Sequence, residues 1–287
     1  MKQEEVSFVS GGLRIAGMLT APEGAGTTRR PAILILHGFG GHRNGPQQKW
    51  SRKFFDELGY VTLSIDFRGC GDSEGKRGAI VPFGMVDDAI AAVAWLRSRP
   101  EVDPARVALS GTSYGATVAV YAAGICPDIC AVIAQGGWAN GEDMFRRIHN
   151  TPDKWARFSQ LLVEARRNDD PTRTVPRYEI IWIPDRLRQN IDGKSIMDFA
   201  IETIPNTLEF NAGDVAARIA PRPLLIIHSA KDEVITADGS IDLFRKAGYH
   251  GDLHILNGVD HFMFEEEDGR VASIVKNWLA KALPVAR

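Results

Sequence analysis

The sequence of 287 residues has only three cysteines, and two of them, Cys126 and Cys130, stand four positions apart. This number and spacing fit neither a disulfide framework nor a CxxC redox motif. No group of histidines and cysteines has the spacing of zinc ligands. We therefore expect ordinary reduced thiols near a helix end and no metal site.

The chain also lacks an excess of positive charge and any long apolar run. Its 34 Lys and Arg against 36 Asp and Glu give a formal net charge of −2, so nothing indicates binding to nucleic acid or to an anionic membrane. No run reaches the roughly 18 apolar residues of a membrane span, and Glu4 and Glu5 stand where a signal peptide would be apolar. We expect a soluble, cytoplasmic protein whose partner is a small molecule. The oligomeric state stays open, and a homodimer is one alternative.

Hydrophobic residues make up 44% of the chain, which is enough for a substantial core. Two alternating strands joined by Gly11 and Gly12 predict an antiparallel hairpin at a sheet edge. From Pro31 onward, short apolar strands alternate with helical patterns, which predicts a parallel sheet with helices on both faces. The expected strands are 6–10, 13–20, 32–36, 61–65, 106–109, 131–135, 224–228 and 252–256, and the expected helices are 50–58, 83–97, 114–124, 241–247 and 271–283.

The alternation stops for about seventy residues after 135, which indicates an insertion. We therefore divide the chain into a first core part (1–135), an inserted cap or lid (136–213) and a second core part (214–287). The insertion is rich in charge, aromatic residues and prolines, so it should form short helices and loops. It could be a surface subdomain with its own small core. We favour a lid, because the insertion follows a sheet strand and so emerges beside the edge where open α/β sheets bind ligands.

The segment GTSYG, residues 111–115, follows an apolar strand and precedes an alanine-rich helix. This context matches the G-x-S-x-G nucleophile elbow, with Ser113 on a tight, strained turn. Gly111 and Gly115 leave room for strand and helix to approach each other. The helix N-terminus beside the serine favours a developing negative charge.

A serine hydroxyl needs a base to become a nucleophile, and the base needs an orienting group. Asp232 and His261 stand in the loops after two later strands, at the same sheet edge as the elbow. The order Ser113, Asp232, His261 is that of α/β hydrolases. Taken alone, Asp232 could be a turn former and His261 a surface histidine. Asp260 competes with Asp232 as the acid.

The loop HGFGG, residues 37–41, follows the expected strand 32–36. An acyl-transfer intermediate carries an oxyanion that needs hydrogen-bond donors already in place. We assign these donors to the backbone N–H groups of Phe39 and Tyr114. His37 looks like a catalytic histidine, but we expect it to hold the loop by hydrogen bonds.

Together these motifs resemble those of the α/β-hydrolase superfamily, and they are strung across the whole core. Within the superfamily the chain is similar to dienelactone hydrolases, feruloyl and cinnamoyl esterases and prolyl-oligopeptidase-like catalytic domains. The resemblance implies an α/β-hydrolase fold, with a mostly parallel sheet of about eight strands, helices on both faces and an inserted, mainly helical cap. Dienelactone hydrolases usually have a cysteine nucleophile, so Ser113 favours the esterases. The resemblance rests on HGFGG (37–41), DFRGCGDSEG (66–75), GTSYGA (111–116), SAKDEV (229–234) and GVDHF (258–262).

Two other patterns are set aside. The glycines at 69–75 are typical of a dinucleotide loop, but Glu74 stands where the third glycine belongs and no convincing helix follows. The same stretch fails the P-loop pattern because Arg77 follows Lys76. We expect a structural loop in which Asp66 and Arg68 are bonded internally. The acidic run at 265–268 is interpreted as a solvated helix start.

The predicted reaction is hydrolysis of a carboxylic ester through an acyl-enzyme. The expected substrate is of small or medium size, with an aromatic group as one option, and no metal or organic cofactor is expected. Trp138 and Trp182 in the insertion are the predicted substrate contacts. Three other functions stay open: an acyl-peptide hydrolase or aminopeptidase, a thioesterase or acyltransferase with the same triad, and a non-catalytic small-molecule-binding protein. The last would be expected to have a broken triad, and no member is missing here.

Overall fold

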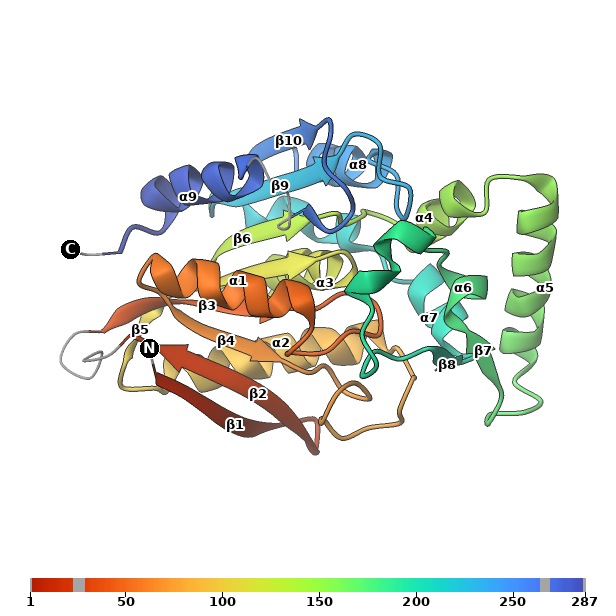
Figure 1. Cartoon of the computed structure of the whole chain (residues 1–287), viewed down its shortest axis with the longest axis horizontal. Coiled ribbons are helices and arrows are strands. Elements are labelled where there is room, and N and C mark those ends of the chain that lie inside the picture. The colour runs from red at the N-terminus through yellow and green to blue at the C-terminus, as the bar shows by residue number, and fades with distance from the viewer. Residues whose placement is uncertain (1, 23–28, 264–268, 286–287) are drawn as a thin grey trace.

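The computed structural model describes residues 2–22, 29–263 and 269–285. Its centre is an eight-stranded sheet (Figure 1). The strands are β1 (Lys2–Ser10), β2 (Leu13–Ala21), β3 (Arg30–Leu36), β4 (Val61–Ile65), β5 (Val102–Thr112), β6 (Ile129–Gln135), β9 (Leu224–Ser229) and β10 (Asp252–Leu256).

The strand order is β1-β2-β4-β3-β5-β6-β9-β10. The hairpin β1-β2 is antiparallel, and β2 also runs antiparallel to β4. Every other neighbouring pair in this sheet is parallel. The predicted mostly parallel sheet of about eight strands, with an antiparallel edge, is therefore confirmed.

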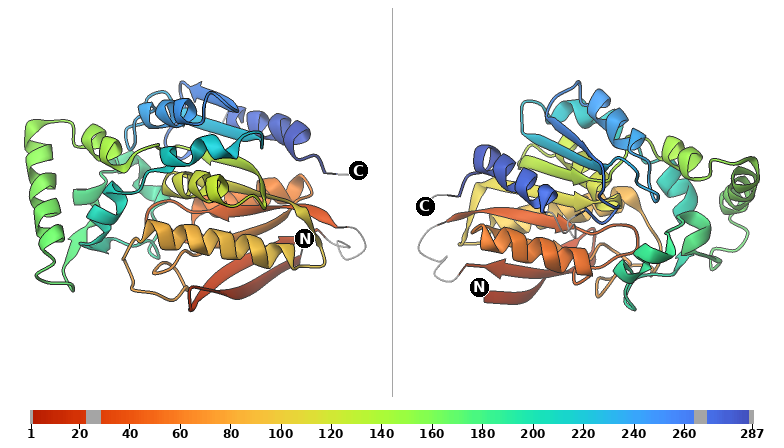
Figure 2. Two further views of the ribbon diagram at one scale, coloured as in Figure 1. Left: turned by 180° about the vertical axis from the view of Figure 1, so that it is seen from behind. Right: turned by 45° about the horizontal axis from the view of Figure 1, so that its top comes forward.

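Helices cover both faces of the sheet, as predicted (Figures 1 and 2). Helices α1 (Pro46–Glu57) and α9 (Arg270–Ala282) lie on one face, and α2 (Pro82–Arg97), α3 (Tyr114–Ile125) and α8 (Asp238–Lys246) lie on the other. Strand β3 is buried on both sides, because Ile33 faces the α1 side while Leu34 faces the α3 side.

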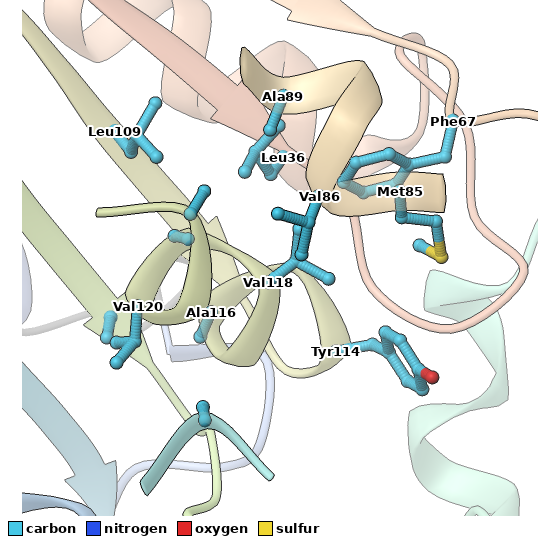
Figure 3. Packing of buried hydrophobic residues seen from close by; sticks show 14 of the residues in the cluster. Leu36, Phe67, Met85, Val86, Ala89, Leu109, Tyr114, Ala116, Val118 and Val120 are labelled. Atoms are coloured by element: carbon cyan, nitrogen blue, oxygen red, sulfur yellow. The ribbon is translucent and has the colours of Figure 1, made fainter. Parts of the chain in front are cut away.

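Helix α3 packs against the sheet and, on the same face, against α2 (Figure 3). Its small residues, such as Ala116, allow a close approach, and Val118 lies among Leu36, Met85 and Val86. Because α3 begins directly after the candidate nucleophile, this packing fixes the position of the elbow.

Most predicted elements are present, with ends that differ by a few residues. Helix α1 begins at Pro46, four residues before the expected start, because proline suits the first turn of a helix. The polar residues Gln47 and Gln48 interrupt the apolar pattern there, so the pattern does not predict this first turn. The acidic run at 265–268 lies outside the described residues, and no helix in the described part is long and apolar enough to cross a membrane.

The inserted segment (residues 136–213) lies beyond the carboxyl ends of the parallel strands (Figures 1 and 2). It is mainly helical, with one short antiparallel pair of strands in its described part, β7 and β8, that the sequence analysis did not predict. Three-residue strands are too short to show an alternating pattern. The elements are α4 (Gly141–Ile148), α5 (Pro152–Arg167), β7 (Thr174–Pro176), α6 (Arg177–Ile180), η1 (Asp185–Asn190), β8 (Asp198–Ala200), α7 (Thr203–Leu208) and η2 (Ala212–Asp214), with η3 (Ala216–Ile219) following before β9.

Candidate active site

Ser113 occupies the turn between β5 and α3. Its φ of 55° and ψ of −119° are rare for a residue with a side chain. A β-carbon on Gly111 would lie 2.2 Å from the carbonyl oxygen of Gly115, and one on Gly115 would lie 2.5 Å from that of Leu36. Only glycine fits at either position, so the strand and helix can approach as the elbow motif predicts.

His261 and Asp232 form a buried pair. The loop after β10 carries the histidine, the loop after β9 carries the aspartate, and Nδ1 of His261 lies 2.6 Å from Oδ2 of Asp232. Asp260 is instead half-exposed, and it accepts a hydrogen bond of 2.9 Å from Arg186. Of the two candidate acids, the structure brings Asp232 to the histidine.

The Asp232 carboxylate is held by more than the histidine. Its Oδ1 accepts the backbone N–H groups of Val234 and Ile235 at 2.8 and 2.9 Å, and Nε2 of His228 lies 3.2 Å from its Oδ2. Burial alone would raise the pKa of Asp232, but attraction to His261 and the hydrogen bonds outweigh burial and hold the pKa well below its usual range. The group is therefore a carboxylate at neutral pH, ready to accept an imidazole N–H.

Ser113 and His261 line one cavity of about 70 Å³. Gly38 and Phe39 also line it, and a β-carbon on Gly38 would lie 3.3 Å from Cβ of Ser113. The loop after β3 therefore passes directly beside the serine. The inserted segment completes the wall with side chains that include Arg177.

Of the two predicted oxyanion donors, Phe39 lines this cavity and Tyr114 directly follows Ser113 in the chain. Tyr114 is the first residue of α3, so its N–H has no partner within the helix. Within the described residues, neither this N–H nor that of Phe39 donates to a protein acceptor. The Phe39 ring packs 5.8 Å from that of Tyr114 and stacks 4.1 Å from Phe199 of the inserted segment.

His37 is fully buried beneath this loop. Its Nε2 accepts the backbone N–H of Phe67 at 3.1 Å, and its Nδ1 donates to the carbonyl of Gly38 at 2.8 Å. Burial lowers the pKa of His37 to about 4, so the ring is neutral at pH 7. The expectation that this histidine holds the loop by hydrogen bonds is confirmed.

The two tryptophans predicted to contact substrate lie elsewhere. Trp138 is 1% exposed and packs edge-on against Tyr114 at 5.2 Å, with its Cβ close to Gly239. It lines neither the Ser113 cavity nor the cavity at Trp182, and it belongs to the hydrophobic core, so its position does not support the predicted contact with substrate.

Trp182 is 52% exposed and lines a second cavity of about 700 Å³. Its neighbours Ile181 and Ile183 line the Ser113 cavity instead, because extended backbone sends alternate side chains to opposite sides. A contact between Trp182 and substrate would therefore take place in this second cavity.

Arg177 and Arg186 of the inserted segment were missed by sequence reasoning. Arg177 lines the Ser113 cavity and donates to the carbonyl of Phe39 at 2.8 Å. Arg186 donates to both Asp260 and Glu233, and so it joins the loops that follow β10 and β9. An arginine in a segment dense in charge looks like a solvated residue, and no local pattern marks either one.

The glycine-rich loop after β4 is built as a structural loop. Asp66 accepts the backbone N–H of Asp72 at 2.8 Å and pairs with Arg43, while Arg68 pairs with Asp88 at 2.7 Å. These contacts agree with the expected internal bonding. In the described part of the chain, no cluster of three or more His, Cys, Asp or Glu could hold a metal ion.

The sheet order, the elbow and the Asp232–His261 pair together define an α/β hydrolase. Residues 27–268 match the family Hydrolase_4, described as Serine aminopeptidase, S33. The chain belongs to this family and is a hydrolase of the α/β-hydrolase superfamily.

Two relatives resemble the chain over most of its length. An uncharacterized 31.7 kDa protein in the traX-finO intergenic region of Escherichia coli is 26% identical, over 94% of this chain and 96% of its own. The thiohydrolase aneE of Aspergillus aculeatus is 28% identical, over 84% of this chain and 80% of its own.

Solved structures share the fold. The α/β hydrolase GrgF from Penicillium sp. sh18 has a TM-score of 0.81 at 21% identity, covering 99% of each chain. Est1E from Butyrivibrio proteoclasticus, solved with ferulic acid bound, has a TM-score of 0.70 at 20% identity, covering 97% of this chain and 99% of its own.

Proposed function

We propose that the protein is a serine hydrolase that cleaves small carboxylic esters through an acyl-enzyme. The observation that carries this proposal is the buried Asp232–His261 pair at the cavity that holds the strained Ser113. Strained backbone is kept where the surrounding structure enforces it, and such positions cluster at active sites.

In the proposed mechanism, Nε2 of His261 takes the Ser113 proton as the serine oxygen attacks the ester carbonyl. Asp232 accepts the Nδ1–H and stabilises the imidazolium charge. The N–H groups of Phe39 and Tyr114 bind the oxyanion, because neither has another acceptor in the described structure. His261 then protonates the leaving alcohol, and water attacks the acyl-enzyme by the reverse proton transfers.

The size of the cavity favours a small acyl group. About 70 Å³ is small beside the 300–1,000 Å³ of ordinary ligand sites. The inserted segment acts as a lid in this proposal, since Arg177, Ile181 and Ile183 form part of the cavity wall. This size argues against an aromatic acyl group in the same cavity.

Two alternatives use the same residues. A thioester substrate is supported by the thiohydrolase among the relatives. An aminopeptidase would need an acidic group to hold a substrate ammonium, but in the described structure no Asp or Glu lines the cavity and Arg177 does. We therefore place ester first, thioester second and aminoacyl amide last.

A substrate panel tests this order. We expect p-nitrophenyl acetate and butyrate to be hydrolysed with a higher kcat/KM than the octanoate, and alanine p-nitroanilide to be inert. S-ethyl thioacetate measures the thioester alternative, and the Ser113→Ala variant gives the background. A preference for the anilide would overturn the proposal, and a kcat/KM for the thioester far above that for the acetate would replace ester with thioester.

A further inference from the structure

Arg177 is a buried cation without a carboxylate partner. Its side chain is 3% exposed, and no ion pair joins it to any Asp or Glu among the described residues. It lies at the start of α6 and reaches the cavity that Ser113 and His261 line. The guanidinium lies beside the stacked rings of Phe39 and Phe199, with its carbon 5.6 Å from the centre of Phe39 and 5.4 Å from that of Phe199.

Protein acceptors among the described residues take up only some of the N–H groups of this guanidinium. Nη2 donates to the carbonyl of Phe39 at 2.8 Å and Nε donates to that of Ile196 at 3.0 Å. A guanidinium has five N–H groups, so three remain without an acceptor in the described structure. Burial lowers the pKa of Arg177 to about 10, which still leaves it charged at neutral pH. A buried charge is unfavourable unless it is paired, so this guanidinium is suited to an anionic partner.

A second donor at the same cavity is also unpaired. Gln47, at the start of α1, is 7% exposed and lines the cavity, and its amide nitrogen is buried with no hydrogen-bond partner. Buried side-chain donors are normally satisfied. A cavity lined by Arg177 and Gln47, and by no acidic side chain among the described residues, suits a ligand group that only accepts hydrogen bonds.

We propose that Arg177 binds a carboxylate carried by the substrate, so that the enzyme selects half-esters and other short esters with a free carboxylate near the scissile bond. This inference rests on the proposed esterase function. A guanidinium donates to a carboxylate through two parallel N–H groups, which would orient the ester as well as attract it. The small cavity limits the carbon chain between the two carboxyl groups to a few atoms.

The carboxylate could belong to the acyl group or to the alcohol. Monoethyl succinate places it on the acyl side, and O-acetyl glycolate places it on the alcohol side. Each has a neutral counterpart of similar shape: ethyl 4-methylpentanoate for the first and isobutyl acetate for the second. The ratio of kcat/KM between the charged and neutral members of a pair measures recognition of the carboxylate alone.

We expect one of the two pairs to show a preference for the charged ester of about tenfold to a hundredfold in the wild type, the range for a hydrogen-bonded charge. Arg177→Gln should bring that ratio to about one, and Arg177→Lys should keep part of it. Because Arg177 also supports the Phe39 loop, either variant can lower all rates, but such a loss cancels in the ratio. Arg188→Gln, which removes a half-buried arginine of the same segment that does not line this cavity, should leave the ratio unchanged.

Binding of succinate to the Ser113→Ala protein, measured by calorimetry, gives a readout without turnover. We expect binding that is lost when Arg177→Gln is added. Hydrolysis of neutral esters with no charged preference in either pair would overturn the inference and leave the proposed function standing. Failure to hydrolyse any ester would overturn the proposed function, whereas succinate binding that depends on Arg177 would still support the carboxylate site.

Discussion

Nδ1 of His261 lies 2.6 Å from Oδ2 of Asp232, although Asp260 is the immediate neighbour of the histidine in sequence. Asp260 is turned to Arg186 instead. Asp232→Asn should therefore lower kcat by about ten-thousandfold, because an amide in place of the carboxylate favours the wrong imidazole tautomer. Asp260→Asn should stay within a few fold of the wild type. Steady-state kinetics with p-nitrophenyl acetate measures both, and the reverse ranking would assign the acid to the loop after β10.

His37 should make the stability of the protein depend on pH. Its pKa is about 4 in the fold, against about 6.5 in an unfolded chain, so the unfolded state binds a proton first as the pH falls. The stability that neutral His37 contributes is complete above pH 6.5 and is lost between pH 6.5 and about 4, by up to about 1.4 kcal/mol per pH unit. Urea unfolding of the wild type and His37→Asn across this range should give converging free energies. Parallel profiles would mean that His37 is not the responsible group.

Gly115→Ala should destabilise the fold through the elbow. The new β-carbon would lie 2.5 Å from the carbonyl oxygen of Leu36, so strand β3 and helix α3 would have to separate. Overpacking of this kind costs about 1–3 kcal/mol. The matched control is Gly193→Ala, where nothing lies within 4 Å of the new atom and the free energy of unfolding should change by less than about 0.5 kcal/mol. Equal effects in the two variants would argue against the tight elbow.

Substitutions of Trp138 and Trp182 should have different effects, the first on the free energy of unfolding and the second on substrate specificity. Trp138→Ala removes a fully buried ring and should reduce the free energy of unfolding by about 3–5 kcal/mol. Trp182→Ala should leave stability nearly unchanged, because that ring is half-exposed. If the second cavity receives longer acyl or alcohol groups, Trp182→Ala should raise KM for octanoate esters and not for acetate esters. A specific rise in KM with stable Trp138→Ala protein would restore Trp138 to the substrate site.

The sheet, the elbow and the order of the three motif residues could be predicted from the sequence, because each depends on local patterns. Buried strands such as β3 contain continuous apolar runs, and Ser113 stands between two glycines that only a sharp strand-to-helix turn requires. The inserted segment was less predictable. Trp138 was placed at the pocket because it follows β6, but its side chain turns to Tyr114 in the core.

Arg177 is the opposite case to Trp138: it lines the Ser113 cavity, but the sequence analysis did not predict it. Its burial depends on Phe39 and Phe199, which are far from it in sequence, and no helical or strand period reports such contacts. Residues whose environment is made by loops from different parts of the chain need the three-dimensional structure.

The most direct test of the account is the site of covalent labelling by a fluorophosphonate, which reacts with an activated serine. The wild type should gain one adduct, and peptide mapping should place it on Ser113. Ser113→Ala should take up no label and lose about a million-fold in ester turnover, while its circular dichroism spectrum stays that of the wild type. Labelling of another residue, or ester hydrolysis by a folded Ser113→Ala protein at the wild-type rate, would contradict the proposal that Ser113 is the nucleophile.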